Sequence, residues 1–161
     1  MRGGTTPPAL LFAALGLELA FAPREARAPS LLALLLTLVA LLFLPIPHAW
    51  LEGVFLACWI SVIATAASVH LTRKLSASAA LVLSINAGIW ADAVTRLSGS
   101  PLDLLEALPW VLTLWPASWV MSRYGTIPIK VVSSWLVAIA ALAAVLQLLP
   151  VTPGYMPDHL E

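Results

Sequence analysis

The chain has 161 residues, of which 61% are hydrophobic and only 10% are charged. A soluble domain carries about 25% charged residues, and long apolar runs are typical of membrane spans. Basic and acidic residues balance at eight each, which excludes a strongly basic surface for nucleic acid. Because one span needs roughly 20 residues, we expect an all-α fold: a polytopic transmembrane helical bundle of about five or six spans with short loops.

The first apolar segment, residues 8–22, is similar to a signal peptide. Arg2 precedes it, and an Ala-x-Ala triplet ends it at residues 20–22. Pro23 directly after the triplet and Glu18 within the run argue against cleavage. Left uncleaved, the segment would form a helix of roughly 22 Å, whereas the hydrocarbon core of a bilayer is about 30 Å thick. A short span, a re-entrant segment and an interfacial helix are all compatible with it.

Two longer segments follow, at residues 30–45 and 49–71. The first is almost wholly apolar and ends in a Pro-Ile-Pro sequence, so it predicts a plain lipid-facing span. The second repeats small hydroxyl residues at Ser61, Thr65 and Ser68. Small residues on one helix face let neighbouring backbones approach closely, so we interpret this row as a packing face rather than a polar pathway.

The fourth segment, residues 79–97, carries the polar residues of greatest functional interest. Asn86 lies near its midpoint, where an amide is expected to bond to a neighbouring helix or, alternatively, to bind an ion or solute. Asp92 lies about 9 Å further along, and Arg96 follows it at i+4, where an ion pair within the helix would neutralise both. The alternatives for Asp92 are a proton- or cation-binding role and pairing with a partner subunit.

Small residues recur on two further helix faces. One row belongs to residues 79–97 and the other to the last segment, residues 129–149. The rows are Ala80, Ser84 and Gly88, and Ser134, Ala138 and Ala141.

The fifth segment, residues 102–121, follows a clear helix-start signal. Ser100 is placed as the N-cap, Pro101 as the first helical residue and Asp103 as the third. Two prolines inside the segment predict kinks. They are Pro109 and Pro116.

Tryptophans crowd the same fifth segment, at Trp110, Trp115 and Trp119. Tryptophan commonly forms interface belts or fills cores, but Trp110 and Trp115 lie deeper than a belt requires. A proline-kinked helix lined with tryptophan is a candidate contact for a lipid or a partner helix.

Basic residues predict the orientation, because short cytoplasmic loops are enriched in lysine and arginine. Six of them fall in alternate loops: Arg24, Arg27, Arg73, Lys74, Arg123 and Lys130. This pattern predicts a multi-pass protein of the cell inner membrane with its tail, residues 150–161, on the external (periplasmic) side.

Soluble-enzyme chemistry is not indicated. Phosphate-binding glycine loops, nucleophile elbows and metalloprotease motifs are absent from the sequence, so we expect no enzyme, no cofactor and no metal. Glu18 is an additional candidate for a polar path: it would be protonated, face a cavity, or reach an interface from a tilted helix.

One local likeness is present. Gly88-x-x-x-Asp92 followed by Ser98-Gly99-Ser100-Pro101-Leu102 resembles a loop of the rod-shape protein MreD, a small polytopic inner-membrane protein. The likeness covers residues 88–102 only and implies no role for any residue.

Two functional hypotheses follow. The first is a non-enzymatic integral membrane subunit that packs within, or helps to assemble, a larger inner-membrane complex, with the lipid bilayer and other membrane subunits or further copies of itself as partners. The second is a small oligomeric transporter or channel with a polar path through Asn86 and Asp92, together with Glu18.

Overall fold

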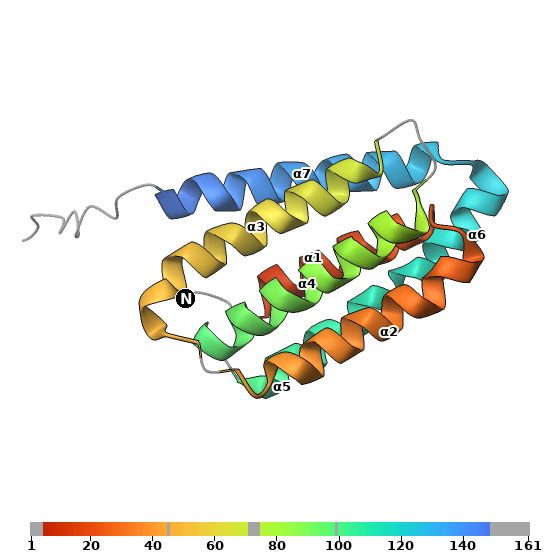
Figure 1. Cartoon of the computed structure of the whole chain (residues 1–161). Helices are drawn as coiled ribbons and strands as arrows, with labels where there is room; N and C mark the ends of the chain where they lie inside the picture. Colours follow the sequence, from red (N-terminus) through yellow and green to blue (C-terminus); the bar gives the residue numbers. More distant parts are fainter. Residues whose placement is uncertain (1–4, 45, 71–74, 99, 149–161) are drawn as a thin grey trace, which may run out of the picture.

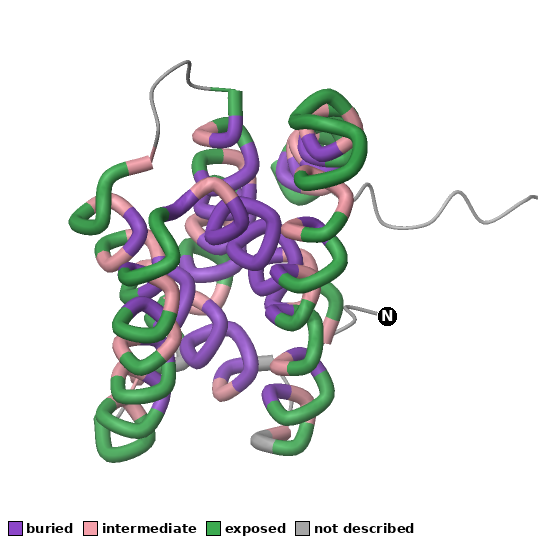
Figure 2. Tube along the Cα trace, turned by 90° about the vertical axis from the view of Figure 1, so that its right-hand side faces the viewer, coloured by how far each residue is buried: buried purple, intermediate pink, exposed green. Residues whose placement is uncertain are grey.

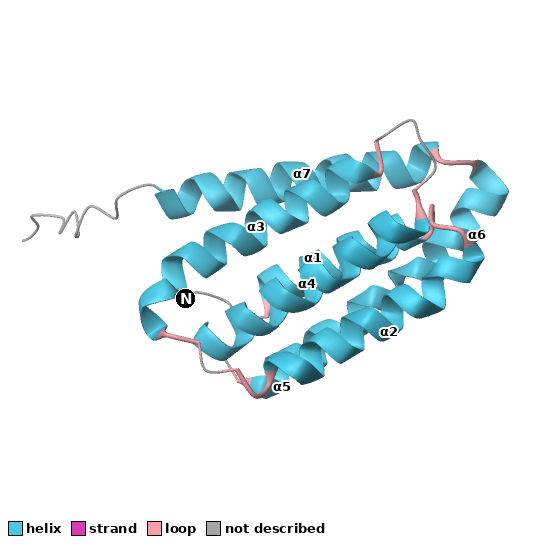
Figure 3. Cartoon of the chain, viewed as in Figure 1, coloured by secondary structure: helices cyan, strands magenta, loops and turns pink. Residues whose placement is uncertain are grey.

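The computed structural model describes residues 5–44, 46–70, 75–98 and 100–148. Regular structure in these ranges is helical throughout (Figure 3), which confirms the predicted all-α class. The predicted tail, residues 150–161, and the basic pair Arg73 and Lys74 lie outside the described residues. The elements are α1 (Thr6–Leu19), α2 (Arg24–Leu41), η1 (His48–Trp50), α3 (Leu51–Ser68), α4 (Ala77–Ser98), α5 (Pro101–Ala107), η2 (Leu108–Thr113), α6 (Leu114–Tyr124) and α7 (Ile127–Leu148).

The bundle is apolar outside as well as inside. Four helical stretches are long and apolar enough to cross a membrane: Leu51–Ser68, Ala77–Leu97, Leu102–Tyr124 and Ile127–Leu148. Large hydrophobic side chains also cover the surface, with Phe43 83% and Leu36 68% exposed. Soluble monomers rarely expose continuous apolar surface on this scale. The helices therefore indicate a membrane-embedded protein.

The short first helix lies at the centre of the bundle. Helix α1 packs against α3, α4, α5, η2, α6 and α7, and Figure 1 shows it behind α4 in the middle of the bundle. Figure 2 shows that the buried parts of the chain gather in this middle. Of its 14 residues, 11 are buried. A helix that is apolar all round has no face suited to water and belongs in a core. Helix α1 therefore lies in the core of the bundle and not at its periphery.

Side chains from neighbouring elements donate hydrogen bonds to backbone carbonyl groups of α1 and of its C-terminal end. Arg27 donates from Nη2 to the carbonyl of Ala20 at 2.9 Å and from Nη1 to Ser118 Oγ of α6 at 3.3 Å. It therefore satisfies a carbonyl at the C-terminal end of α1, where helical partners run out. Thr113 Oγ1 of η2 donates to the carbonyl of Ala13 at 3.2 Å.

Small residues mediate close contacts between helices of this same chain. The predicted row on α4 is buried, and its Gly88 faces α2: a Cβ added to Gly88 would lie 3.0 Å from Thr37 Cβ. The predicted row on α7 is not the face that packs within this chain, because Ser134 and Ala138 are exposed. The buried face of α7 is formed by Ile129, Ser133, Leu136, Ala140 and Ala144.

Two predicted boundaries also differ from the structure. Helix α2 begins at Arg24, before the predicted start at residue 30, and contains Pro29 within it. The predicted fifth span is divided into α5, η2 and α6, with Pro109 in the 3-10 segment and Pro116 early in α6. Each proline removes a backbone donor, which agrees with the predicted kinks. The predicted start is confirmed, because Ser100 and Asp103 form a capping box.

We predict that Gly16→Ala destabilises the bundle by about 1–3 kcal/mol, the usual effect of overpacking a close contact. A Cβ at Gly16 would overlap Thr113 Oγ1 and lie 2.7 Å from the backbone oxygen of Val111. The matched control is Gly53→Ala, since a Cβ at Gly53 meets nothing within 4 Å. Thermal unfolding in mild detergent should show a lower midpoint for Gly16→Ala alone; equal midpoints for the two variants would contradict the close approach of α1 and η2.

Candidate functional site

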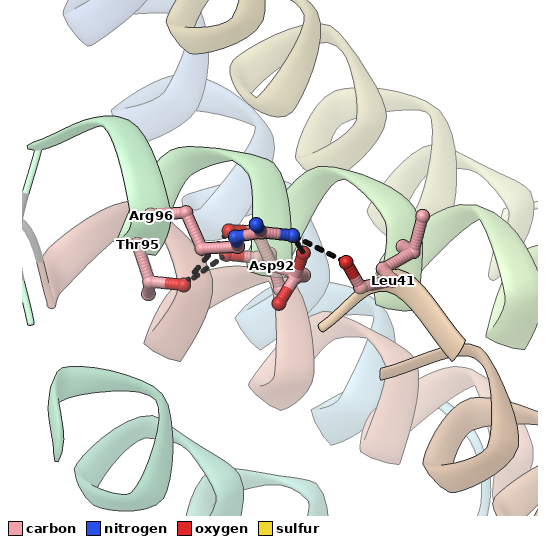
Figure 4. A network of polar contacts seen from close by, with 5 residues as sticks. Leu41, Asp92, Thr95 and Arg96 are labelled. Carbon is pink, nitrogen blue, oxygen red and sulfur yellow. Dashed lines mark hydrogen bonds and ion pairs between the residues drawn. The ribbon is translucent and has the colours of Figure 1, made fainter. Parts of the chain in front are cut away.

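The first polar cluster is an ion pair between Asp92 and Arg96 on α4. Arg96 Nη1 lies 3.6 Å from Asp92 Oδ2, and the Asp92 side chain is 1% exposed against 25% for Arg96. The same Nη1 donates to the carbonyl of Leu41 at the end of α2, as Figure 4 shows. Arginine therefore neutralises the buried carboxylate and satisfies a terminal carbonyl of the neighbouring helix. Thr95 Oγ1 lies 3.0 Å from the carbonyl of Ala91 and 2.9 Å from that of Asp92.

The second cluster joins α3 to α4 near the middle of both helices. Asn86 Nδ2 donates to Ser61 Oγ, and Trp90 Nε1 donates to Asn86 Oδ1 at 3.0 Å. The amide thus uses both its donor and its acceptor within the chain. This is the packing role expected of a polar residue at a helix contact.

The third cluster lies at the opposite end of the bundle from Asp92. Glu18, in the last turn of α1, is 1% exposed. Ser68 Oγ at the end of α3 lies 2.7 Å from Glu18 Oε1 and 2.6 Å from the carbonyl of Thr65. Glu18 Oε2 and Thr65 Oγ1 are buried and have no hydrogen-bond partner among the described residues.

The three clusters lie at different depths. Helices α3 and α4 run antiparallel (Figure 1), so Ser68 and Asp92 lie in opposite directions from the Ser61–Asn86 contact. At 1.5 Å per residue, each step is about 10 Å along the axis. Glu18 and Asp92 are therefore separated by roughly 20 Å along the bundle. They do not face one common site.

Hollows in the described part of the surface lie elsewhere. One of about 340 Å³ is lined by Ala49, Trp50, Gly53, Val54 and Trp90. A second of about 310 Å³ lies between the start of α1 and η2, and a third of about 230 Å³ lies between the start of α3 and the end of α7. None of these three is lined by Glu18, Asn86 or Asp92.

The predicted tryptophans point away from the core. Trp110, Trp115 and Trp119 are 54%, 68% and 57% exposed. Trp119 makes an edge-to-face contact with Tyr124 at 6.2 Å between ring centroids. No indole N–H of these three donates a hydrogen bond to any described residue. We refer to the three side chains as the Trp face.

Among the described residues, no group of three or more His, Cys, Asp or Glu side chains could hold a metal ion. Cys58 is buried and free. The sequence indicated neither the Arg27 cap on α1 nor the pairing of Glu18 with Ser68. Both connect residues from different helices, and the only available signal was their placement near predicted helix ends.

Comparison with known proteins leaves the family open: no protein-family model matches the chain, and neither a curated protein nor a solved structure does. The likeness of residues 88–102 to a rod-shape protein loop therefore remains local.

We predict that Arg96→Leu destabilises the protein by about 3 kcal/mol, because it leaves the Asp92 carboxylate buried without a cation. The double variant Asp92→Asn/Arg96→Leu should recover a large part of this loss, since no charge is then buried. Arg123→Leu is the control, because Arg123 is exposed and makes no ion pair among the described residues. Unfolding free energies in detergent provide the measurement, and additive losses in the double variant would refute the pairing.

Proposed function

We propose that the protein is a non-enzymatic integral membrane subunit that packs within, or helps to assemble, a larger membrane protein complex. The observation that carries this proposal is the Trp face. Its tryptophans extend from a kinked helical stretch of span length into the surroundings of the bundle, where lipid or another protein must meet them.

The depth of two tryptophans within their helical stretch supports the proposal. Trp110 and Trp115 occupy the middle of the stretch Leu102–Tyr124, each more than about 10 Å from either end. Tryptophan favours the membrane interface because its N–H can reach water or headgroups there. Trp115 is beyond that reach, whereas Trp110 lies one helical turn from the exposed Glu106 and lines a hollow with it.

The indole N–H groups of the same two tryptophans also support the proposal. The indole N–H groups of Trp110 and Trp115 find no acceptor among the described residues, and lipid tails offer none. A polar group left unpaired in an apolar medium costs about 1–3 kcal/mol by protein mutational data. A partner helix that supplies carbonyl, hydroxyl or amide oxygens removes that cost. The best-matched occupant of the Trp face is therefore a transmembrane helix of another subunit.

The internal polar groups support the same proposal over the alternative. A small oligomeric transporter or channel would bring Glu18, Asn86 and Asp92 to one water-filled path. Asn86 instead bonds to Ser61 and Trp90, and Asp92 pairs with Arg96. Their separation along the bundle favours a packing role, and the transporter remains the second proposal.

The proposed placement is the cell inner membrane. Described basic residues at the end of the bundle that holds the α1–α2 and α6–α7 connections are Arg24, Arg27, Arg123 and Lys130. Under the positive-inside rule this end is cytoplasmic. The last residues of α7 lie at the other end (Figure 1), which puts the C-terminal side of the chain outside.

We predict that a photo-activatable residue placed at Trp110 or Trp115 cross-links to a discrete membrane protein in native membranes. The same residue at Leu36 on α2, which is as exposed as Trp115 at 68%, should label lipid alone. Trp110→Phe/Trp115→Phe keeps the apolar rings and removes both N–H donors. This variant should fold and lose the complex in mild detergent.

Labelling of lipid alone from all three positions would contradict the subunit proposal. A monodisperse monomer that moves solute in vesicles would instead favour the transporter.

A further inference from the structure

We propose that Glu18 is a proton-binding site inside the bundle, carried as a neutral carboxylic acid that donates its hydrogen to Ser68. This goes beyond the partner-binding proposal and stands independently of it, since every group involved belongs to this chain. The ligand is a proton taken from solvent onto Glu18 Oε1, with no other bond formed or broken.

The Ser68 hydroxyl carries a single hydrogen. Ser68 Oγ lies 2.7 Å from Glu18 Oε1 and 2.6 Å from the Thr65 carbonyl oxygen, and both distances are typical of O–H···O bonds. A serine hydroxyl has one donor and two acceptor positions. A carbonyl oxygen can only accept. If Ser68 donates to Thr65, a usual local bond for serine in a helix, the contact with Glu18 requires a hydrogen on the carboxyl group.

Protonation satisfies both contacts at once. Glu18 Oε1–H then donates to Ser68 Oγ, and Ser68 Oγ–H donates to the Thr65 carbonyl. An ionised Glu18 would compete with that carbonyl for one hydrogen. These two hydrogen bonds also connect the last turn of α1 to the last turn of α3.

The absence of a cation paired with Glu18 among the described residues also favours the neutral acid. Glu18 is 1% exposed, and none of the described residues forms an ion pair with it. Its second oxygen, Oε2, has no hydrogen-bond partner in the described chain. A buried carboxylate without a cation or full hydrogen bonding is strongly disfavoured, and such groups become neutral instead. Asp92 differs in its charge partner alone: Arg96 Nη1 lies 3.6 Å from its Oδ2, although both Asp92 carboxylate oxygens also lack a hydrogen-bond partner among the described residues.

Charged and titratable groups near this end of α1 are engaged elsewhere or lie on other helices. Arg27 donates to Ala20, Ala22 and Ser118, and His70 Nε2 lies 3.3 Å from Ser134 Oγ. The first half of α4 carries no ionisable residue. The acids of α5 lie at the opposite end of the bundle, and η2 has no ionisable group. The remaining described groups at this end are Arg24, Glu25, Arg123, Tyr124 and Lys130.

Thr65 supplies a further polar group beside the site. Its Oγ1 is fully buried and without a partner, one helical turn from Ser68. Orphan hydroxyls of this kind are commonly satisfied by a buried water. Glu18 Oε2, as an acceptor, and Thr65 Oγ1, as a donor, are the two groups that such a water would serve.

Infrared difference spectroscopy of the full chain in phosphatidylcholine vesicles tests the proposal. At neutral pH the protein should show the carbonyl stretch of a protonated acid, with a shift in D₂O. Glu18→Gln should abolish this band while preserving the fold, because glutamine can also donate to Ser68. Glu25→Gln and Asp92→Asn should leave the band in place.

Ser68→Ala keeps Glu18 intact and serves if Glu18→Gln fails to fold. Loss of the hydrogen-bond acceptor should move the carbonyl stretch to higher frequency. A protein without the band at neutral pH would overturn the proposal, as would a band that Glu18→Gln leaves unchanged or a Ser68→Ala band at the wild-type frequency.

Discussion

Burial of α1 is the constraint on which the other contacts depend. A helix surrounded by helices is shielded from bulk water, so most of its buried donors and acceptors need a partner from the same chain. Arg27 supplies one at the C-terminal carbonyls, Thr113 bonds to the carbonyl of Ala13, and Ser68 meets the one carboxyl group. Three different elements are thereby fixed around α1.

The same constraint explains how the chain treats its two buried acids. Asp92 has an arginine one turn away on its own helix, and the pair also holds the end of α2. Glu18 has no cation that pairs with it among the described residues, and a proton with the Ser68 hydroxyl takes that role in our account. Burial makes an unpaired charge costly for both acids, and the local sequence determines whether a cation can pair with the carboxylate. The arginine at i+4 is available only to Asp92.

Features with a local cause were predictable from the sequence. The Asp92–Arg96 pair follows from i,i+4 spacing, and the start of α5 follows from Ser100, Pro101 and Asp103. Features that depend on contacts between helices far apart in the sequence were not predictable. Nothing in residues 8–22 reveals that this segment is the centre of the bundle, because an apolar helix of this length also suits a peripheral position. The face of α7 that packs within this chain did not follow from its small residues, because Ser134 and Ala138 face outward.

Lipid contact tests the central position of α1 most directly. Leu11 and Leu15 are fully buried, whereas Leu36 on α2 is 68% exposed. Methyl NMR spectra of the protein in nanodiscs that contain spin-labelled acyl chains should show strong broadening of the Leu36 methyl signals. The Leu11 and Leu15 signals should remain sharp. Equal broadening of all three would place α1 against lipid and contradict the account.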